Sequence, residues 1–239
     1  MYKERAYRRL PGSDDLVSFE IKEKQTDLYI LAARDLSSQA RESVLVCRAQ
    51  IEDYIAKNPE FYTALTPINI AEGAGEIVRA MAEAAGKAGV GPMAAIAGAV
   101  SEFVGRDLLA FSDQVIVENG GDIFLKTSRK RVIGVHAGEA SPFTGKIAIE
   151  IAPSEEGLGV CTSSGTVSHS LSFGNADAAL IISANAALAD AVATKAGNAV
   201  KSIYDIEKGI DLARSVAGVR GVLIMIGDKM GSWGEIKLV

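Results

Sequence analysis

Cysteine and histidine are scarce in this chain of 239 residues, which holds two of each. Cys47 and Cys161 form neither a Cys-x-x-Cys motif nor a zinc-ligand spacing, so the sequence does not indicate a thiolate metal site. A disulfide between them stays open, although two free thiols in a cytosolic protein are the ordinary expectation for so few cysteines. Cysteine therefore defines no function here.

Positive charge is also in short supply. The 25 Lys and Arg residues are outnumbered by 30 Asp and Glu, which gives a net charge of -5 and a pI of about 5.2. A general nucleic-acid binder needs a basic face to meet the phosphates. The charge balance therefore argues against a nucleic-acid partner.

Long apolar runs are missing as well. No stretch reaches the length of a membrane span, and the first fifteen residues, MYKERAYRRLPGSDD, lack the apolar core of a signal peptide. The sequence therefore predicts a cytoplasmic protein without a membrane partner. Aromatic residues make up only 6% of the chain, whereas glycine occurs 24 times, which favours close backbone packing over a large aromatic core.

Hydrophobic periodicity predicts helices that alternate with antiparallel hairpins. The expected strands are residues 16–22, 27–32, 114–118, 123–126, 131–136, 145–151, 178–183, 221–226 and 234–239. The expected helices are residues 37–57, 71–88, 93–109, 185–200 and 206–216. Residues 157–174 are rich in Ser and Gly and are expected to form a loop. Residues 2–10 fit either an edge strand or an anion-binding arm.

A weak internal repeat joins the two halves of the chain. VIVENGGDIFL follows the helix 93–109, and VLIMIGDKMGSWGEIKL follows the helix 206–216. Both give a strand, a glycine turn and then Gly-acid-Ile-x-Leu. Two helix-then-hairpin halves predict an α+β fold with an antiparallel sheet and helices on one side, duplicated within a single domain, residues 1–239, with a break near 127–157.

Asp190 and Thr194 interrupt an alanine-rich helix that is expected to begin near Asn185. The two residues are four positions apart and therefore stack on one helix face. A carboxylate and a hydroxyl are hard oxygen ligands of the kind that Mg²⁺ prefers. In the alternative interpretation, Asp190 caps a neighbouring loop or pairs with an Arg, since a buried carboxylate needs a donor or a cation.

Two further segments are candidates for ligand binding. The turn Asn119–Asp122 lies between apolar runs and is typical of a hairpin. The hydroxyl-rich segment 157–174 suits contacts to phosphate or flavin, but it also suits an ordinary exposed turn. It contains Thr162, Ser163, Ser164, Gly165 and His169.

Taken together, these segments resemble the ApbE-like superfamily, whose typical members are FAD:protein FMN transferases. The turn Asn119-Gly120-Gly121-Asp122 resembles the Asn-x-Gly-Gly-Asp turn of the family, and residues 160–165 (Val-Cys-Thr-Ser-Ser-Gly) resemble its Ala-Thr-Ser-Gly loop. Residues 188–194 (Leu-Ala-Asp-Ala-Val-Ala-Thr) are similar to its Ala-Asp-Ala-x-Ala-Thr helix and form the most specific segment. The order of the three segments also agrees with the family.

The resemblance implies an FAD site in which Asp190 and Thr194 hold Mg²⁺, with a backbone carbonyl from residues 95–97 completing the coordination. Asp190 and His169 would be the catalytic residues. His169 would take the proton from a Ser or Thr hydroxyl of an acceptor protein, whose oxygen attacks the FMN phosphorus and expels AMP. A surface histidine is the alternative for His169. The implied flavin-binding residues are Asn119, Gly120, Gly121, Asp122, Thr162, Ser163, Ser164 and Gly165.

This chain also departs from the family pattern. Ile96-Ala97-Gly98-Ala99 replaces the family's Ala-Lys-Gly-Tyr, residues 169–173 (His-Ser-Leu-Ser-Phe) replace His-Ile-x-Asp-Pro, and the usual lipoprotein signal is missing. These departures are typical of a divergent cytosolic branch. They keep two alternatives open: a non-catalytic flavin- or nucleotide-binding protein, and an enzyme for another phosphate-containing small molecule. The Ala- and Gly-rich helices also suit a homodimer.

Overall fold

The computed structural model describes residues 13–138, 141–165 and 172–239. An eight-stranded antiparallel sheet forms its centre, in the order β1-β2-β3-β4-β7-β8-β9-β10. The strands of this sheet are β1 (Val17–Glu23), β2 (Thr26–Ala32), β3 (Val115–Asn119), β4 (Asp122–Thr127), β7 (Ser154–Ser163), β8 (Ala178–Ser183), β9 (Val219–Ile226) and β10 (Lys229–Gly234).

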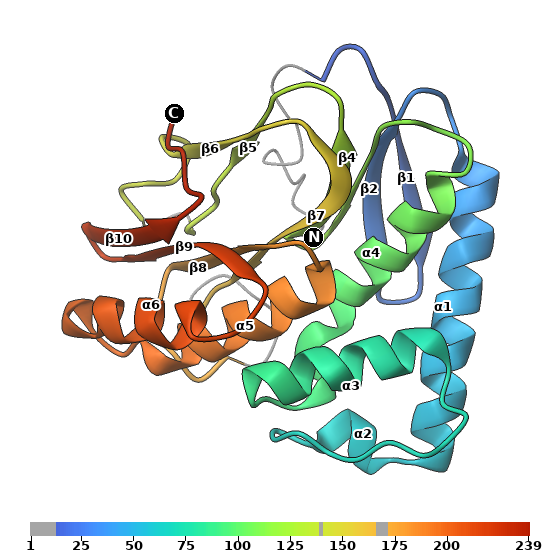
Figure 1. The fold of residues 1–239 in the computed structure, drawn as a ribbon, viewed down its shortest axis with the longest axis horizontal. Helices are drawn as coiled ribbons and strands as arrows, with labels where there is room; N and C mark the ends of the chain where they lie inside the picture. The colour runs from blue at the N-terminus through green and yellow to red at the C-terminus, as the bar shows by residue number, and fades with distance from the viewer. Residues whose placement is uncertain (1–12, 139–140, 166–171) are drawn as a thin grey trace.

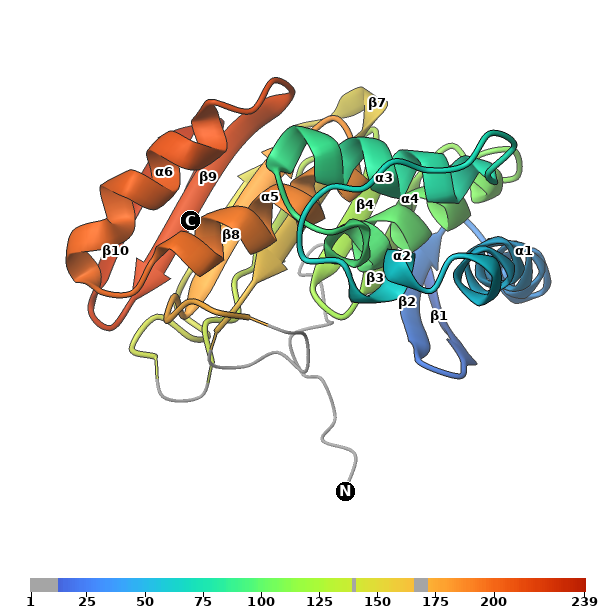
Figure 2. The same cartoon turned by 90° about the horizontal axis from the view of Figure 1, so that it is seen from below.

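The α-helices of the described chain lie on one side of this sheet (Figures 1 and 2). They are α1 (Ser37–Lys57), α2 (Glu60–Thr63), α3 (Glu76–Ala88), α4 (Ile96–Leu108), α5 (Ala186–Ala199) and α6 (Ile206–Arg214), and the 3₁₀ turns η2 (Pro92–Ala95) and η3 (Ile203–Asp205) lead into α4 and α6. A two-stranded sheet of β5 (Arg131–Gly134) and β6 (Ala148–Ile151) lies on the other side. The α+β architecture predicted from the sequence is confirmed, while the duplication and the domain bounds stay predictions.

Two hydrophobic clusters flank the sheet, because successive side chains of a strand point to opposite faces. On β8, Ile181 packs towards the helices, whereas Ile182 packs towards β5 and β6. Val117 and Ile116 divide in the same way on β3. Because both faces are covered, these strands have continuous apolar sequences rather than an alternating pattern.

The loop predicted for residues 157–174 is wrong in its first part, because Ser154–Ser163 forms the strand β7. The glycines that suggested a loop are positions where neighbours come close. A Cβ atom on Gly157 would lie 2.5 Å from Cζ of Phe124, and one on Gly159 would lie 2.7 Å from the backbone nitrogen of Ala186. Glycine serves dense packing in this strand instead of a turn.

The last predicted strand, residues 234–239, is also displaced. The final strand of the main sheet is β10, which pairs with β9 across a turn in which Gly227 has a φ of +60°. Gly234, with a φ of +75°, then turns the chain away. Leu238 forms an isolated bridge with Ile149 of β6. Helix α3 begins at Glu76 rather than at residue 71, since Gly73 has a φ of +80°.

No single helix of the described chain has both the length and the apolar composition needed to cross a membrane. Helix α3 and residues 92–108 meet that test only as a pair, and the pair is bent by 104°.

Candidate functional site

Helix α5 carries Asp190 and begins where the sequence predicts. Asn185 is its N-cap residue, and its side-chain oxygen accepts a hydrogen bond from the backbone N–H of Leu188 at 2.7 Å. Such a cap satisfies a donor that the first helical turn leaves unpaired. The buried strand β8 leads directly into this cap and fixes where α5 starts.

The Asp190 carboxylate lies at the N-terminus of α4. Its Oδ2 accepts a hydrogen bond from the backbone N–H of Gly98 at 2.9 Å, and the N–H of Ala97 also donates to the carboxylate. Asp190 therefore caps the start of a helix, α4, and not a loop. Burial raises the pKa of Asp190 to about 7, and the two backbone hydrogen bonds oppose this rise.

The close approach of α4 and α5 depends on Gly98. A Cβ atom on this residue would lie 2.8 Å from Cβ of Asp190, and closer still to the carbonyl oxygen of Ala186. Gly159 of β7 also brings its backbone against Ala186. Two glycines thus let one helix and one strand meet the first turn of α5.

The predicted hairpin turn lies beside the same helix terminus. Asn119 pairs with Asp122 across the turn, and Gly120 and Gly121 have φ values of +67° and +108°, which glycine adopts without strain. The side-chain Nδ2 of Asn119 donates to the carbonyl oxygen of Ala97 at 3.2 Å. The turn is thereby attached to the first residues of α4.

Asp122 adds a second carboxylate to the site. It is 8% exposed, and its Oδ1 accepts a hydrogen bond from the backbone N–H of Thr162 at 3.3 Å. Burial, followed by the charge of Asp190, raises the pKa of Asp122 well above its ordinary value, while a hydrogen bond with the Cys161 thiol opposes the rise. Within the part of the chain that the structure describes, neither aspartate forms an ion pair with Lys or Arg.

The remaining predicted residues are spread along α5 and the end of β7. Thr194 lies one turn beyond Asp190 and is partly buried. The Ser163 hydroxyl lies near Gly197, further along α5, and Ser164 is buried. The Gly165 N–H donates to the carbonyl oxygen of Ala176 at 2.9 Å. His169 lies outside the described residues.

Sequence reasoning missed Glu102. This residue of α4 is 1% exposed, and its Oε2 accepts hydrogen bonds from the backbone N–H groups of Ala186 and Ala187, at 2.7 and 3.3 Å. Arg106 forms an ion pair with Oε1 at 2.5 Å. In the sequence, a Glu four residues before an Arg is typical of an exposed helical pair, so nothing indicated burial.

The oxygen atoms of the residues predicted to bind the metal, together with those of Asp122, are hard ligands. Asp190, Asp122, Thr194 and the carbonyl of Ala97 are of the type that suits Mg²⁺, which takes one or two protein carboxylates and completes its shell with phosphates and water. Among the described residues, no group of three or more His, Cys, Asp and Glu side chains is arranged to hold a metal ion.

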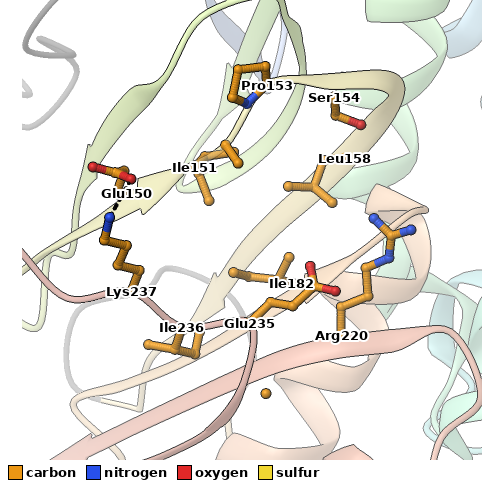
Figure 3. Close-up of a pocket in the computed structure, with 12 residues that line it drawn as sticks. Glu150, Ile151, Pro153, Ser154, Leu158, Ile182, Arg220, Glu235, Ile236 and Lys237 are labelled. Carbon is orange, nitrogen blue, oxygen red and sulfur yellow. Dashed lines mark hydrogen bonds and ion pairs between the residues drawn. The ribbon is translucent and has the colours of Figure 1, made fainter.

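A cavity of about 450 Å³ lies on the opposite face of the sheet, between β6, β7, β9 and the C-terminal residues (Figure 3). Its apolar floor is formed by Ile151, Leu158 and Ile182, which are 2 to 6% exposed. At its rim, Glu150 and Lys237 form an ion pair at 2.8 Å. Because the floor is already buried, the cavity offers little apolar surface to a ligand.

Comparisons with known proteins identify the family and the fold of this chain. A family model described as AbpE bacteria matches residues 8–217. The UPF0280 protein of Methanococcus aeolicus is 43% identical over 202 residues, 82% of this chain and 81% of the relative. The UPF0280 protein of Methanocella arvoryzae is 38% identical over 214 residues, 89% of this chain and 86% of the relative.

Solved structures match the fold. The flavin transferase ApbE from Vibrio cholerae gives a TM-score of 0.60 at 12% identity, covering 92% of this chain and 97% of that protein. The apo form of the flavinyl transferase ApbE from Pseudomonas stutzeri gives 0.61 at 12% identity, covering 92% and 94%. The ApbE-like fold predicted from the sequence motifs is thereby confirmed.

Proposed function

The chain belongs to the family described as AbpE bacteria, and on that premise we propose that it is a magnesium-dependent enzyme acting on FAD. It would work either as an FAD:protein FMN transferase or as an FAD pyrophosphatase. One observation carries the proposal: Asp190 caps the N-terminus of α4, its charge raises the pKa of the buried Asp122 carboxyl, and neither carboxylate has a Lys or Arg partner among the described residues. Two such charges favour a bound divalent cation.

Asp190 and Thr194 would hold the magnesium ion, and the Ala97 carbonyl would complete its protein ligands. Bound magnesium would neutralise negative charge on the FAD pyrophosphate. The backbone of the Asn119–Asp122 turn and the hydroxyls of Thr162 and Ser163 would contact the flavin nucleotide. These roles follow the order of the motifs along α5 and β7.

His169 would act as the general base. It would take a proton from a Ser or Thr hydroxyl of an acceptor protein, or from water in a pyrophosphatase. The oxygen would then form a bond to the FMN phosphorus, while the bond to the AMP oxygen breaks and AMP leaves. The acceptor protein and a homodimeric state remain part of this proposal.

A non-catalytic flavin- or nucleotide-binding protein is the second candidate, and a specific observation favours it. Ala97 and Ala99 stand where transferases of the superfamily carry Lys and Tyr, and Ala99 is fully buried. The start of α4 therefore offers neither a cation for phosphate nor a ring for flavin. The same observation also leaves open the alternative of an enzyme that acts on a different phosphate-containing small molecule.

Calorimetry of FAD binding with and without Mg²⁺ tests the proposal. The variants are Asp190→Asn and Thr194→Val, and Asp211→Asn on the exposed side of α6 is the matched control. We expect FAD binding that requires Mg²⁺, is lost in Asp190→Asn, is weakened in Thr194→Val and is unchanged in the control. AMP release under Mg²⁺ then separates an enzyme from a binding protein. Absence of FAD binding in the wild type would refute the proposal.

A further inference from the structure

Helices α4 and α5 cap each other. Asp190 of α5 accepts hydrogen bonds from the first-turn N–H groups of α4, and Glu102 of α4 accepts hydrogen bonds from the first-turn N–H groups of α5. Each carboxylate thus meets the positive end of the other helix, where negative charge is stabilised. Because each helix carries the carboxylate that caps the other, a shift of either helix would break both sets of hydrogen bonds.

The Glu102 side of this exchange is the more completely satisfied. Its Oε2 meets two backbone donors, at 2.7 and 3.3 Å, and its Oε1 meets the Arg106 guanidinium, whose side chain is 58% exposed. The Asn185 side chain also donates to Oε1 at 3.4 Å. Such a network fixes the first turn of α5 to α4. Asp190 follows one turn later on α5, so its position is set by the same contact.

We propose that Glu102 is a positioning residue for the proposed magnesium site: by capping α5, it holds the Asp190 carboxylate at the N-terminus of α4. The inference rests on the proposed function only in assigning a magnesium ion to the site. The coupling between the two caps is argued from the hydrogen bonds alone. Mutation of outer residues that orient metal ligands in this way typically lowers metal affinity or activity by about tenfold to a hundredfold.

Amide hydrogen exchange by NMR tests the coupling without any ligand. In Glu102→Gln, we expect the N–H groups of Ala97 and Gly98 to exchange about tenfold faster, although the substituted side chain does not contact them. Glu83→Gln on α3 is the matched control, because Glu83 forms a similar i,i+4 pair with Lys87 on an exposed surface. A purely structural cap would speed exchange at Ala186 and Ala187 alone.

The second readout is the Mg²⁺ concentration that gives half-maximal FAD binding. Glu102→Gln should raise this concentration roughly tenfold to a hundredfold, with Glu83→Gln unchanged. Unchanged exchange at Ala97 and Gly98, together with unchanged Mg²⁺ dependence, would overturn the positioning role. Coupled exchange in a protein that binds neither Mg²⁺ nor FAD would overturn the proposed function instead.

A substitution at the other cap, Asp190→Asn, tests the same inference if Glu102→Gln does not fold. If the two caps are coupled, the N–H groups of Ala186 and Ala187 should exchange faster in Asp190→Asn. Glu102 of α4 caps these groups, and the substituted side chain does not. Exchange there that matches the wild type would contradict the coupling.

Discussion

Replacing Gly98 with alanine should loosen the site by a predictable amount. The new methyl group would lie 2.8 Å from Cβ of Asp190 and closer still to the carbonyl oxygen of Ala186, against ordinary contacts of 3.4 Å and longer, so α4 and α5 must separate by more than 0.6 Å. Overpacking of this kind costs about 1–3 kcal/mol, and the better helix propensity of alanine offsets up to about 1 kcal/mol. We expect a net loss of up to about 3 kcal/mol in the free energy of unfolding, with a central value of roughly 1–2 kcal/mol.

Gly86→Ala is the matched control, because it makes the same chemical change within helix α3. A Cβ atom on Gly86 meets nothing within 4 Å, so this variant should gain about 0.5–1 kcal/mol. Urea unfolding followed by circular dichroism should therefore move the two midpoints in opposite directions. Mg²⁺-dependent FAD binding should weaken only in Gly98→Ala. Equal stabilisation of both variants would refute the close approach of α4 and α5.

Three further predictions concern titration and reactivity. Arg131 lowers the pKa of Asp15 to about 2, so Asp15 should contribute stability above pH 3.8 that is lost as the pH falls towards 2, and acid unfolding of Asp15→Asn should lack that slope. Burial raises the pKa of Glu102, so this side chain binds a proton more tightly in the folded state than in the unfolded state. The free energy of unfolding should therefore fall as the pH rises above the ordinary glutamate pKa, and the fall should be smaller in Glu102→Gln. Both cysteines are buried with raised thiol pKa values, so a thiol reagent should label neither in the folded protein and both in urea.

Local patterns in the sequence were enough to predict the hairpin Asn119–Asp122 and the helix that carries Asp190. The hairpin depends on two glycines that accept positive φ, and the helix depends on an Asn cap and a run of alanines. Each signal lies within a few neighbouring residues. The α+β architecture followed because the order of such local elements restricts the topology.

The partners of the buried carboxylates could not be predicted in this way. Asp190 and Gly98 are 92 positions apart, and Glu102 and Ala186 are 84 apart, so their contacts exist only once the helices pack. Packing also explains a glycine that the sequence suggested was a loop residue. Gly159 suggested a loop because its close neighbour, Ala186, is not visible in the sequence around it.

Three carboxylates near the crossing of α4 and α5 differ in how well their charge is compensated: Glu102 and Asp122 are buried, and Asp190 is half-buried. Glu102 has two backbone donors and an arginine, whereas Asp122 has one backbone donor at 3.3 Å and a thiol, and the charge of Asp190 raises the pKa of Asp122 further. Burying like charges together costs stability that a hydrophobic pair would not. Folded proteins keep such local conflicts at functional sites, where a ligand resolves them. We therefore propose that the ligand binds at the Asp122–Asp190 pair and that Glu102, which has the larger set of donors, supports this site.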